Sequence, residues 1–292
     1  MSKEIPHIDF ESAYSKVEGI EIITLESLIK RTKDLDHNPE KAHHLSFNIL
    51  IYYTHGKSKH LVDFVWHDVQ KNTLIHLSKG QVHAFKFNED IKGFLIMFTE
   101  DYLKKQLNKL PKSEIIRLFN SHLFSPRIQV PENSNVEKYI NLFSEEYFNE
   151  HNSYNKQKIC DSLYTILFSK LEQLKQYQTF HLKNTEKLET FIAFKSLVEK
   201  YYTSSRNADF YASKLNITYK HLNVICKTIV DTTAKSFIDT FVILEAKRLL
   251  INSSIKSNEL AFKMGFNEPT NFVKYFKKQT GLTPNSFKKE YL

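Results

Sequence analysis

The chain has 292 residues, 25% of them charged and 41% hydrophobic, which is enough for about two domains with buried cores. It has no apolar run of about 18 residues, and its first residues lack the apolar segment of a signal peptide. These features exclude a transmembrane helix and predict a cytoplasmic protein. The only cysteines, Cys160 and Cys226, are far apart in sequence, which argues against a disulfide scaffold.

The net charge of +8 is unevenly distributed along the chain. Residues 184–292 hold 17 Lys and Arg against 10 Asp and Glu, whereas residues 1–183 hold 24 against 23. A basic C-terminal part next to a nearly neutral N-terminal part favours contact between the basic part and a polyanion. Charge alone also allows a basic domain that is merely soluble.

Residues 20–98 have the composition of a β-rich domain. Short segments rich in Ile, Phe, Tyr and Val alternate with segments that resemble turns. Strands are expected at residues 21–28, 47–53, 63–66, 73–78, 83–87 and 93–99, with breaks at 54–60, 67–72 and 88–92. Several short, evenly spaced strands predict an antiparallel barrel or sandwich.

Residues 100–176 change to helical spacing, with helices expected at 101–107, 113–119, 136–148 and 156–174. The last helix has an apolar stripe at steps of three and four, formed by Ile159, Leu163, Ile166, Leu167, Leu171 and Leu174. Such a stripe most often packs on the core of its own domain. The polar segment 177–186 is the expected linker between a domain at 1–176 and a domain at 187–292.

The C-terminal domain is expected to begin with a helix at 190–202 and then to contain two helix pairs. In the first pair, a helix at 208–215 is followed by a turn and by a helix that Thr218 caps. The apolar side chains that this second helix should bury are Leu222, Ile225, Cys226 and Ile229. A long helix at 234–252 connects the two pairs.

In the second pair, a helix at 258–264 ends at Gly265, where the backbone can take a positive φ. Asn267 is expected to cap the next helix, and Pro269 is tolerated in its first turn. This helix should turn Phe272, Tyr275, Phe276 and Gln279 to one side and basic and polar residues to the other. Two helices joined by a tight turn, the second with a polar basic face, predict a helix-turn-helix unit.

The second pair also carries a resemblance to a known family. The matching residues are Ala261, Gly265-Phe266, Phe272, Phe276-Lys277, Gly281, Thr283-Pro284 and Phe287-Lys288. Their spacing resembles the signature of the AraC/XylS family of bacterial transcription regulators, which carry two helix-turn-helix units in one C-terminal domain. The resemblance covers residues 184–292 well and the rest loosely.

The resemblance implies an α+β protein with two parts. The N-terminal part would be a cupin-like β-barrel with a helical dimerisation segment, and the C-terminal part an all-α domain with two helix-turn-helix units. The helix at 156–174 would then be a dimer seam instead of a core helix. The implied partners are double-stranded DNA, a second copy of the chain, a small-molecule effector and RNA polymerase, without a membrane.

The outward faces of the two second helices supply the candidate DNA contacts. They are Lys220, Asn223, Val224, Lys227, Thr270, Asn271, Lys274, Lys277 and Lys278. The asparagines suit adenine edges, Lys220 and Lys274 suit guanine acceptors, and Thr270 suits a base or a thymine methyl. The other three lysines are better placed for phosphates. Val224 gives the first helix an apolar tip, and the alternative for each lysine is a solvated helix face.

A small organic effector is expected in the N-terminal barrel. Its predicted cavity is lined by Tyr52, Trp66, His83, Phe85 and Phe87, although alternating aromatic residues also form plain cores. The barrel region is rich in histidine, but it has no His-x-His motif, and Asn48 stands where a glutamate would help. We therefore expect no metal and no cofactor.

No catalytic constellation occurs in the sequence. G-x-S-x-G, a phosphate-binding glycine loop and H-E-x-x-H are all missing, so an enzyme is not expected. The leading hypothesis is a sequence-specific DNA-binding transcription regulator that responds to an effector. The alternative is a cupin-type small-molecule-binding protein or enzyme with a DNA-binding tail. The sequence leaves open the effector, the operator, and activation versus repression.

Overall fold

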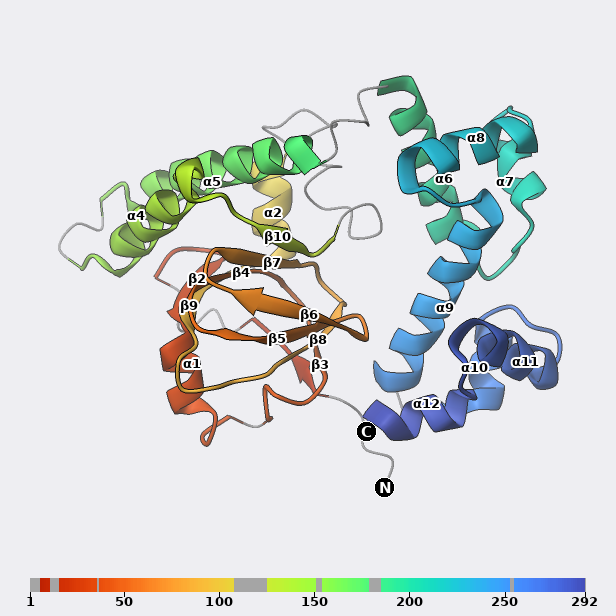
Figure 1. Ribbon diagram of the computed structural model, residues 1–292, viewed down its shortest axis with the longest axis horizontal. Coiled ribbons are helices and arrows are strands. Elements are labelled where there is room, and N and C mark those ends of the chain that lie inside the picture. The colour runs from red at the N-terminus through yellow and green to blue at the C-terminus, as the bar shows by residue number, and fades with distance from the viewer. Residues whose placement is uncertain are drawn as a thin grey trace. The chain divides into compact units, whose positions relative to one another are not determined.

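The computed structural model describes residues 6–10, 16–35, 37–107, 125–150, 154–178, 185–252 and 255–291 (Figure 1). The chain divides into two compact units, Pro6–Gln178 and Thr179–Leu292. The first unit contains strands and helices, and the described part of the second contains helices alone. This arrangement confirms the predicted α+β class, with a β-rich N-terminal part and an all-α C-terminal part.

Two five-stranded sheets build the N-terminal unit. The first sheet has the order β1 (His7–Ile8), β3 (His43–Leu45), β8 (Val82–Phe85), β5 (Lys57–Val62), β6 (Val65–Gln70). The second has the order β10 (Arg127–Gln129), β7 (Thr73–Leu77), β4 (Asn48–His55), β9 (Lys92–Phe98), β2 (Ile20–Thr24). The β1–β3 pair is parallel, and the other pairs in these sheets are antiparallel.

Strand β4 is buried on both faces, and its alternating side chains belong to two different cores. Ile49, Ile51 and Tyr53 join a cluster that also contains side chains of the first sheet. Leu50 and Tyr52 join a second cluster, formed with helices on the other side of the sheet. The unit therefore has three layers: one sheet, a second sheet, and a helical layer.

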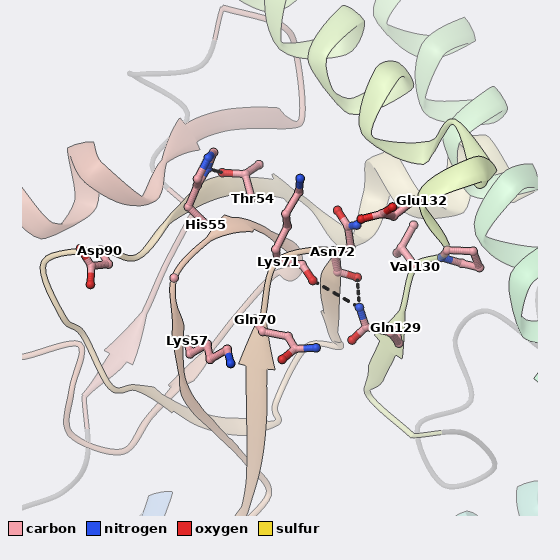
Figure 2. Close-up of a pocket in the computed structure, with 12 residues that line it drawn as sticks. Thr54, His55, Lys57, Gln70, Lys71, Asn72, Asp90, Gln129, Val130 and Glu132 are labelled. Carbon is pink, nitrogen blue, oxygen red and sulfur yellow. Dashed lines mark hydrogen bonds between the residues drawn. The ribbon is translucent and has the colours of Figure 1, made fainter.

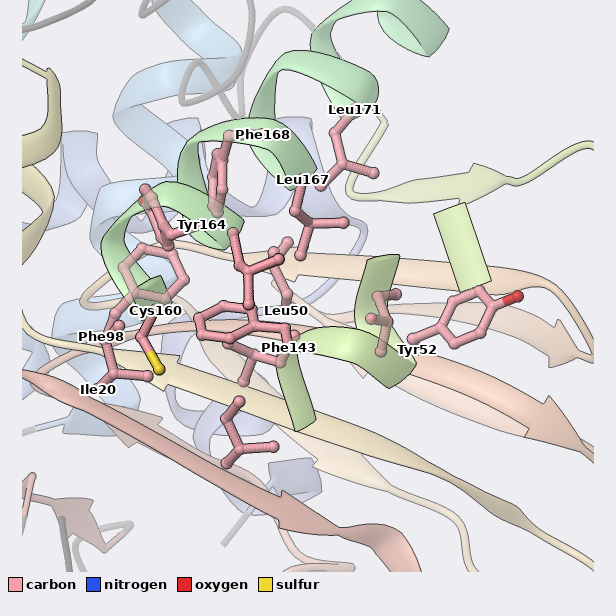
Figure 3. Close-up of a cluster of buried hydrophobic side chains, with 14 of the residues drawn as sticks. Ile20, Leu50, Tyr52, Phe98, Phe143, Cys160, Tyr164, Leu167, Phe168 and Leu171 are labelled. Atoms are coloured by element: carbon pink, nitrogen blue, oxygen red, sulfur yellow. The ribbon is translucent and has the colours of Figure 1, made fainter. Parts of the chain in front are cut away.

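The helical layer consists of α2 (Glu100–Leu107), α4 (Val136–Phe148) and α5 (Lys156–Gln178) (Figure 1). Helix α5 turns one side toward the second sheet, and the buried side chains on this side are Cys160, Leu163, Tyr164, Leu167, Phe168 and Leu171 (Figure 3). Ile159 and Ile166 are 40% and 41% exposed on the other side. The predicted stripe therefore contains residues from two faces of α5. One of these faces packs in the core of its own unit, and the other is exposed.

The predictions for residues 21–28, 54–60, 63–66 and 67–72 are wrong in detail. The expected strand at 21–28 ends at Thr24, whose side chain accepts a hydrogen bond from the Ser27 amide and starts α1 (Leu25–Arg31). The expected breaks at 54–60 and 67–72 lie largely within β5 and β6. Their polar residues belong to an outer hairpin with its turn at Asp63 and Phe64, both at positive φ (45° and 71°).

The C-terminal unit begins with α6 (Thr185–Tyr201) and contains two helix pairs. The first pair is α7 (Ala208–Lys214) and α8 (Tyr219–Val230), and the second is α10 (Ser257–Lys263) and α11 (Pro269–Thr280). Helix α9 (Ala234–Asn252) connects the pairs, and α12 (Pro284–Tyr291) follows α11. Both α8 and α11 contact α9, so the connecting helix supports both pairs.

Some expected boundaries differ from the structure. Helix α5 extends to Gln178 and α6 begins at Thr185, so both ends of the predicted linker 177–186 are helical. The cap of α11 is Glu268 and not Asn267, because the helix begins at Pro269. The expected helix at 113–119 lies outside the described residues.

Candidate nucleic-acid interface

Helix α8 is held by a cap at its start and by an apolar face. The Thr218 hydroxyl accepts a hydrogen bond from the His221 amide at 3.1 Å, as the sequence predicted. The predicted inward residues are all buried: Leu222, Ile225, Cys226 and Ile229. Asp231 ends the helix in the left-handed conformation at φ 51°. The opposite face of α8 is thereby fixed toward solvent.

That outward face carries Lys220, Val224 and Lys227, which are all exposed. Asn223 is only partly exposed, and its side-chain oxygen accepts a hydrogen bond from the Ala234 amide at 2.9 Å. It thus binds the first residue of α9. This bond uses one of the two acceptor positions of the Asn223 oxygen, and the contact of Asn223 with an adenine edge stays a prediction.

Helix α11 has the same construction. Pro269 occupies its first turn, Phe272 and Phe276 are fully buried, and Gly281 ends it at φ 79°. The predicted outward residues are all exposed: Thr270, Asn271, Lys274, Lys277 and Lys278. Gln279, which was expected to face inward, is exposed as well. The outward face of α11 therefore offers an amide, a hydroxyl and three ammonium groups.

Arg206 connects the two helix pairs, a role that no motif in the sequence predicts. Its guanidinium group donates to the carbonyl oxygens of Met264 and Gly265 at 3.0 and 3.3 Å, and it lies over the Phe266 ring at 3.8 Å. Arg206 precedes α7, whereas its partners form the turn between α10 and α11. The one available signal was that Arg206 and Arg248 are the only arginines in residues 184–292.

The lysines on the outward faces of α8 and α11 have no ion-pair partner among the described residues. Across the described parts of the chain, no ion pair involves Lys220, Lys227, Lys274, Lys277 or Lys278. By contrast, Lys195 pairs with Glu199, Lys235 with Asp239, and Arg248 with Glu245. Lys263 and Lys289, among the described residues, also lack an ion pair, so unpaired positive charge lies on α8 and α11 without being confined to them, and a polyanion can neutralise it there.

The five predicted effector residues do not line one cavity. Tyr52 faces the helical layer, where its hydroxyl donates to Asn72 at 2.9 Å, and Trp66 is 48% exposed on β6. His83 and Phe85 are buried in the first sheet, and Phe87 stacks on Phe85 with 5.0 Å between ring centroids. The prediction failed because both faces of β4 are buried. The alternation of side chains along a strand does not show which of two buried faces carries Tyr52.

An open pocket of about 800 Å³ lies elsewhere in this unit (Figure 2). It is formed by the β4–β5 turn, the β6–β7 turn, Asp90, and the segment that leads from β10 into the short helix η2 (Glu132–Ser134). The polar and charged residues in its lining include Lys57, Gln70, Lys71, Asn72, Gln129 and Glu132. Its volume is in the range of small-molecule sites.

Three buried histidines are in contact within the first sheet. A ring nitrogen of His60 lies 3.3 Å from a ring nitrogen of His83, and the ring centroids of His43 and His83 are 4.1 Å apart. Burial lowers the pKa of His43 to about 4 and the pKa of His60 to about 3, so these rings are neutral at pH 7. In the described residues, no group of three or more His, Cys, Asp or Glu could hold a metal ion.

Comparison with known proteins identifies the C-terminal unit. A family described as "Helix-turn-helix domain" matches residues 211–290, which run from α7 to α12. The Msm operon regulatory protein of Streptococcus mutans is 26% identical over 140 residues, 47% of this chain and 49% of that protein. An uncharacterised HTH-type transcriptional regulator of Pseudoalteromonas carrageenovora is 30% identical over 94 residues, 32% and 55% of the two chains.

Among solved structures, fatty-acid-bound ToxT from Vibrio cholerae aligns over 93% of this chain and 95% of its own, with a TM-score of 0.47 and 12% identity. This chain spans about half the length of the curated relatives that it matches. Residues 211–290 form a helix-turn-helix domain of the AraC type, the DNA-binding domain of transcription regulators, and this confirms the resemblance on the C-terminal side.

No described helix is long and apolar enough to cross a membrane.

Proposed function

We propose that this protein is a cytoplasmic, sequence-specific transcription regulator. Its C-terminal unit contacts duplex DNA through the outward faces of α8 and α11, and its N-terminal unit carries dimerisation and effector binding. RNA polymerase is the expected protein partner at a promoter. The observation that supports this proposal best concerns α8 and α11. Each has a buried inner face and carries exposed lysines without an ion-pair partner on its outer face.

The length of the connecting helix bears on the spacing of the two DNA contacts. Helix α9 has 19 residues, and at 1.5 Å per residue it is about 28 Å long. Successive major grooves on one face of DNA are about 34 Å apart. Helices α8 and α11, both supported by α9, would therefore enter adjacent major grooves of one site.

The experiment that tests this function is selection of bound duplexes from random DNA with the purified full-length chain. A common motif with two short conserved blocks about one helical turn apart is the expected result. Footprinting on the selected site should then protect two successive major grooves. Retention of DNA without any enriched motif would contradict sequence-specific recognition.

For dimerisation we propose the solvent side of α5. Exposed residues follow the heptad spacing of a helix seam: Ile159, Ser162, Ile166, Ser169 and Gln173. Two apolar side chains and two small ones would let a second α5 approach closely. Two copies on one DNA molecule would raise the effective concentration of each DNA-binding domain at paired half-sites.

For effector binding we propose the open pocket in Figure 2. Hydrogen bonds connect the pocket to the helical layer. Asn72, which lines the pocket, accepts a hydrogen bond at 2.9 Å from Tyr52, which faces that layer. The Tyr52 hydroxyl also lies 3.5 Å from a Glu137 carboxylate oxygen in α4. A ligand that moved Asn72 would therefore act on α4, which packs against α5. Ligand-dependent protection of residues 129–137 from hydrogen exchange would support this site.

A further inference from the structure

The outward face of α8 differs chemically from the outward face of α11. On α11, Asn271 and Lys274 are exposed, and both carry polar groups that suit base edges. On α8, the side-chain oxygen of Asn223 accepts a hydrogen bond from the backbone N–H of Ala234. The residue next to it, Val224, is 45% exposed and apolar. The first helix-turn-helix unit therefore presents a methyl surface where the second presents hydrogen-bonding groups.

Val224 lies between two free cations on one side of the helix. Lys220 is four residues before it and Lys227 three residues after it, so all three side chains share a face. Neither lysine has an ion-pair partner in the described structure. If the two lysines bind phosphates on either side of a groove, Val224 is directed at the groove between them.

The valine side chain is suited to an apolar contact in that place. A β-branched side chain in a helix has one strongly preferred rotamer, so it loses little freedom when it binds. Valine is a poorer helix former than alanine, and the 45% of Val224 that is exposed gains no burial in its own unit. In the major groove of DNA, the apolar group available to such a side chain is the C5-methyl of thymine.

We propose that Val224 is a specificity-determining residue of the first helix-turn-helix unit and contacts a thymine methyl group. This inference rests on the proposed DNA-binding function. It means that one half of the operator contains a T·A pair selected by an apolar contact, while the half that α11 contacts is selected by hydrogen bonds. The two halves of the site then differ in the chemistry of their recognition.

The test replaces each thymine of the selected site, one at a time, by deoxyuridine. This change removes the C5-methyl group and keeps every hydrogen-bonding group of the base. The full-length chain should bind one such site about fourfold more weakly, the effect of losing one buried methyl group. Val224→Ala should bind the thymine site more weakly and lose the distinction between thymine and deoxyuridine at that position.

Lys227→Ala is the matched control on the same helix face. It should weaken binding to the thymine site and the deoxyuridine site equally, so the ratio between them stays that of the wild type. Circular dichroism should show that both variants remain folded, because both side chains are exposed.

Two results would overturn the proposal, and they are distinguishable. If the chain selects a motif but Val224→Ala keeps the wild-type response to every deoxyuridine, Val224 does not contact a thymine methyl, and the proposed function stands. If the chain selects no motif at all, the proposed function fails together with this inference.

Discussion

The phenol of Tyr275 on α11 donates a hydrogen bond to the Asp239 carboxylate on α9 at 2.8 Å. Asp239 is also paired with Lys235, one turn earlier on α9. Burial, together with the bond to Asp239, raises the pKa of Tyr275 well above its usual value, so the phenol stays protonated. Together with the buried Phe272 and Phe276, the contact holds the inner face of α11 toward α9, and Lys274 lies on the exposed side.

Tyr275→Phe removes this hydrogen bond and keeps the ring. We expect the C-terminal unit to lose about 0.5–1.5 kcal/mol of unfolding free energy, somewhat more if the remaining Asp239 stays desolvated. Chemical unfolding followed by far-UV circular dichroism measures the change. A variant as stable as the wild type would show that the contact does not hold α11.

Gly265 and Gly281 form a matched pair for a second prediction, since both have positive φ (75° and 79°). A Cβ at Gly265 would lie 1.7 Å from the carbonyl oxygen of Thr203, whereas a Cβ at Gly281 would meet nothing within 4 Å. Gly281→Ala should therefore cost only the left-handed backbone, roughly 1–2 kcal/mol.

Gly265→Ala should cost this amount and roughly 1–3 kcal/mol more, because the turn must move away from Thr203. It should also disturb the two carbonyl groups that Arg206 binds. Thermal unfolding of the two variants side by side measures the difference. Equal melting temperatures would contradict the close approach of the two backbone segments.

Neighbouring residues on α5 separate the core from the proposed dimer seam. Leu167 is fully buried against the second sheet, and Ile166 is 41% exposed on the opposite side. Leu167→Glu places a carboxylate in the core and should unfold the N-terminal unit. Ile166→Glu should leave that unit folded and split the dimer.

Analytical ultracentrifugation together with thermal melting distinguishes these outcomes. Ser162→Glu, on the same exposed stripe as Ile166, should also give a folded monomer. A folded Ile166→Glu variant that sediments as a dimer would remove this face of α5 from the interface.

The buried histidines predict how the stability of the N-terminal unit depends on pH. In the unfolded chain a histidine binds a proton near pH 6.5, whereas burial lowers the pKa of His43 to about 4 and of His60 to about 3. The unfolded state therefore binds more protons below pH 6.5. The free energy of unfolding should fall as the pH drops from about 6.5 toward 4, by up to about 1.4 kcal/mol per pH unit for each histidine.

Denaturant titrations at several pH values measure this slope, and the fluorescence of Trp66 is a suitable signal because Trp66 is the only tryptophan. His43→Asn should make the dependence shallower. His221→Asn, which replaces an exposed histidine on α8, should leave it unchanged. Stability that is constant between pH 7 and pH 4 would contradict the neutral buried cluster.

Local features of the C-terminal unit could be predicted from the sequence. Thr218 as a cap, the buried face of α8 and the turn at Gly265 all depend on residues within a few positions of each other. Contacts between distant segments could not be predicted in this way. The bond from Ala234 to Asn223 and the contacts of Arg206 exist only once the helices have packed.

The N-terminal unit was harder to predict for the same reason. The stretch at 54–60 resembles a loop because it contains no apolar side chain, and the buried apolar residues of β5, Leu61 and Val62, come only after it. The pocket in Figure 2 gathers residues from four separate segments. No single segment of the sequence carries a signal for it.

The central claim is that the outward faces of α8 and α11 bind DNA, and the salt dependence of binding tests it most directly. The affinity of the full-length chain for its selected site should fall linearly with salt on logarithmic axes. Lys278→Ala should reduce that slope by about one and weaken all sequences alike. Lys274→Ala should cost about 1–3 kcal/mol on the selected site and relax the preference at one base pair. Binding that does not respond to salt, or that neither variant changes, would contradict the account.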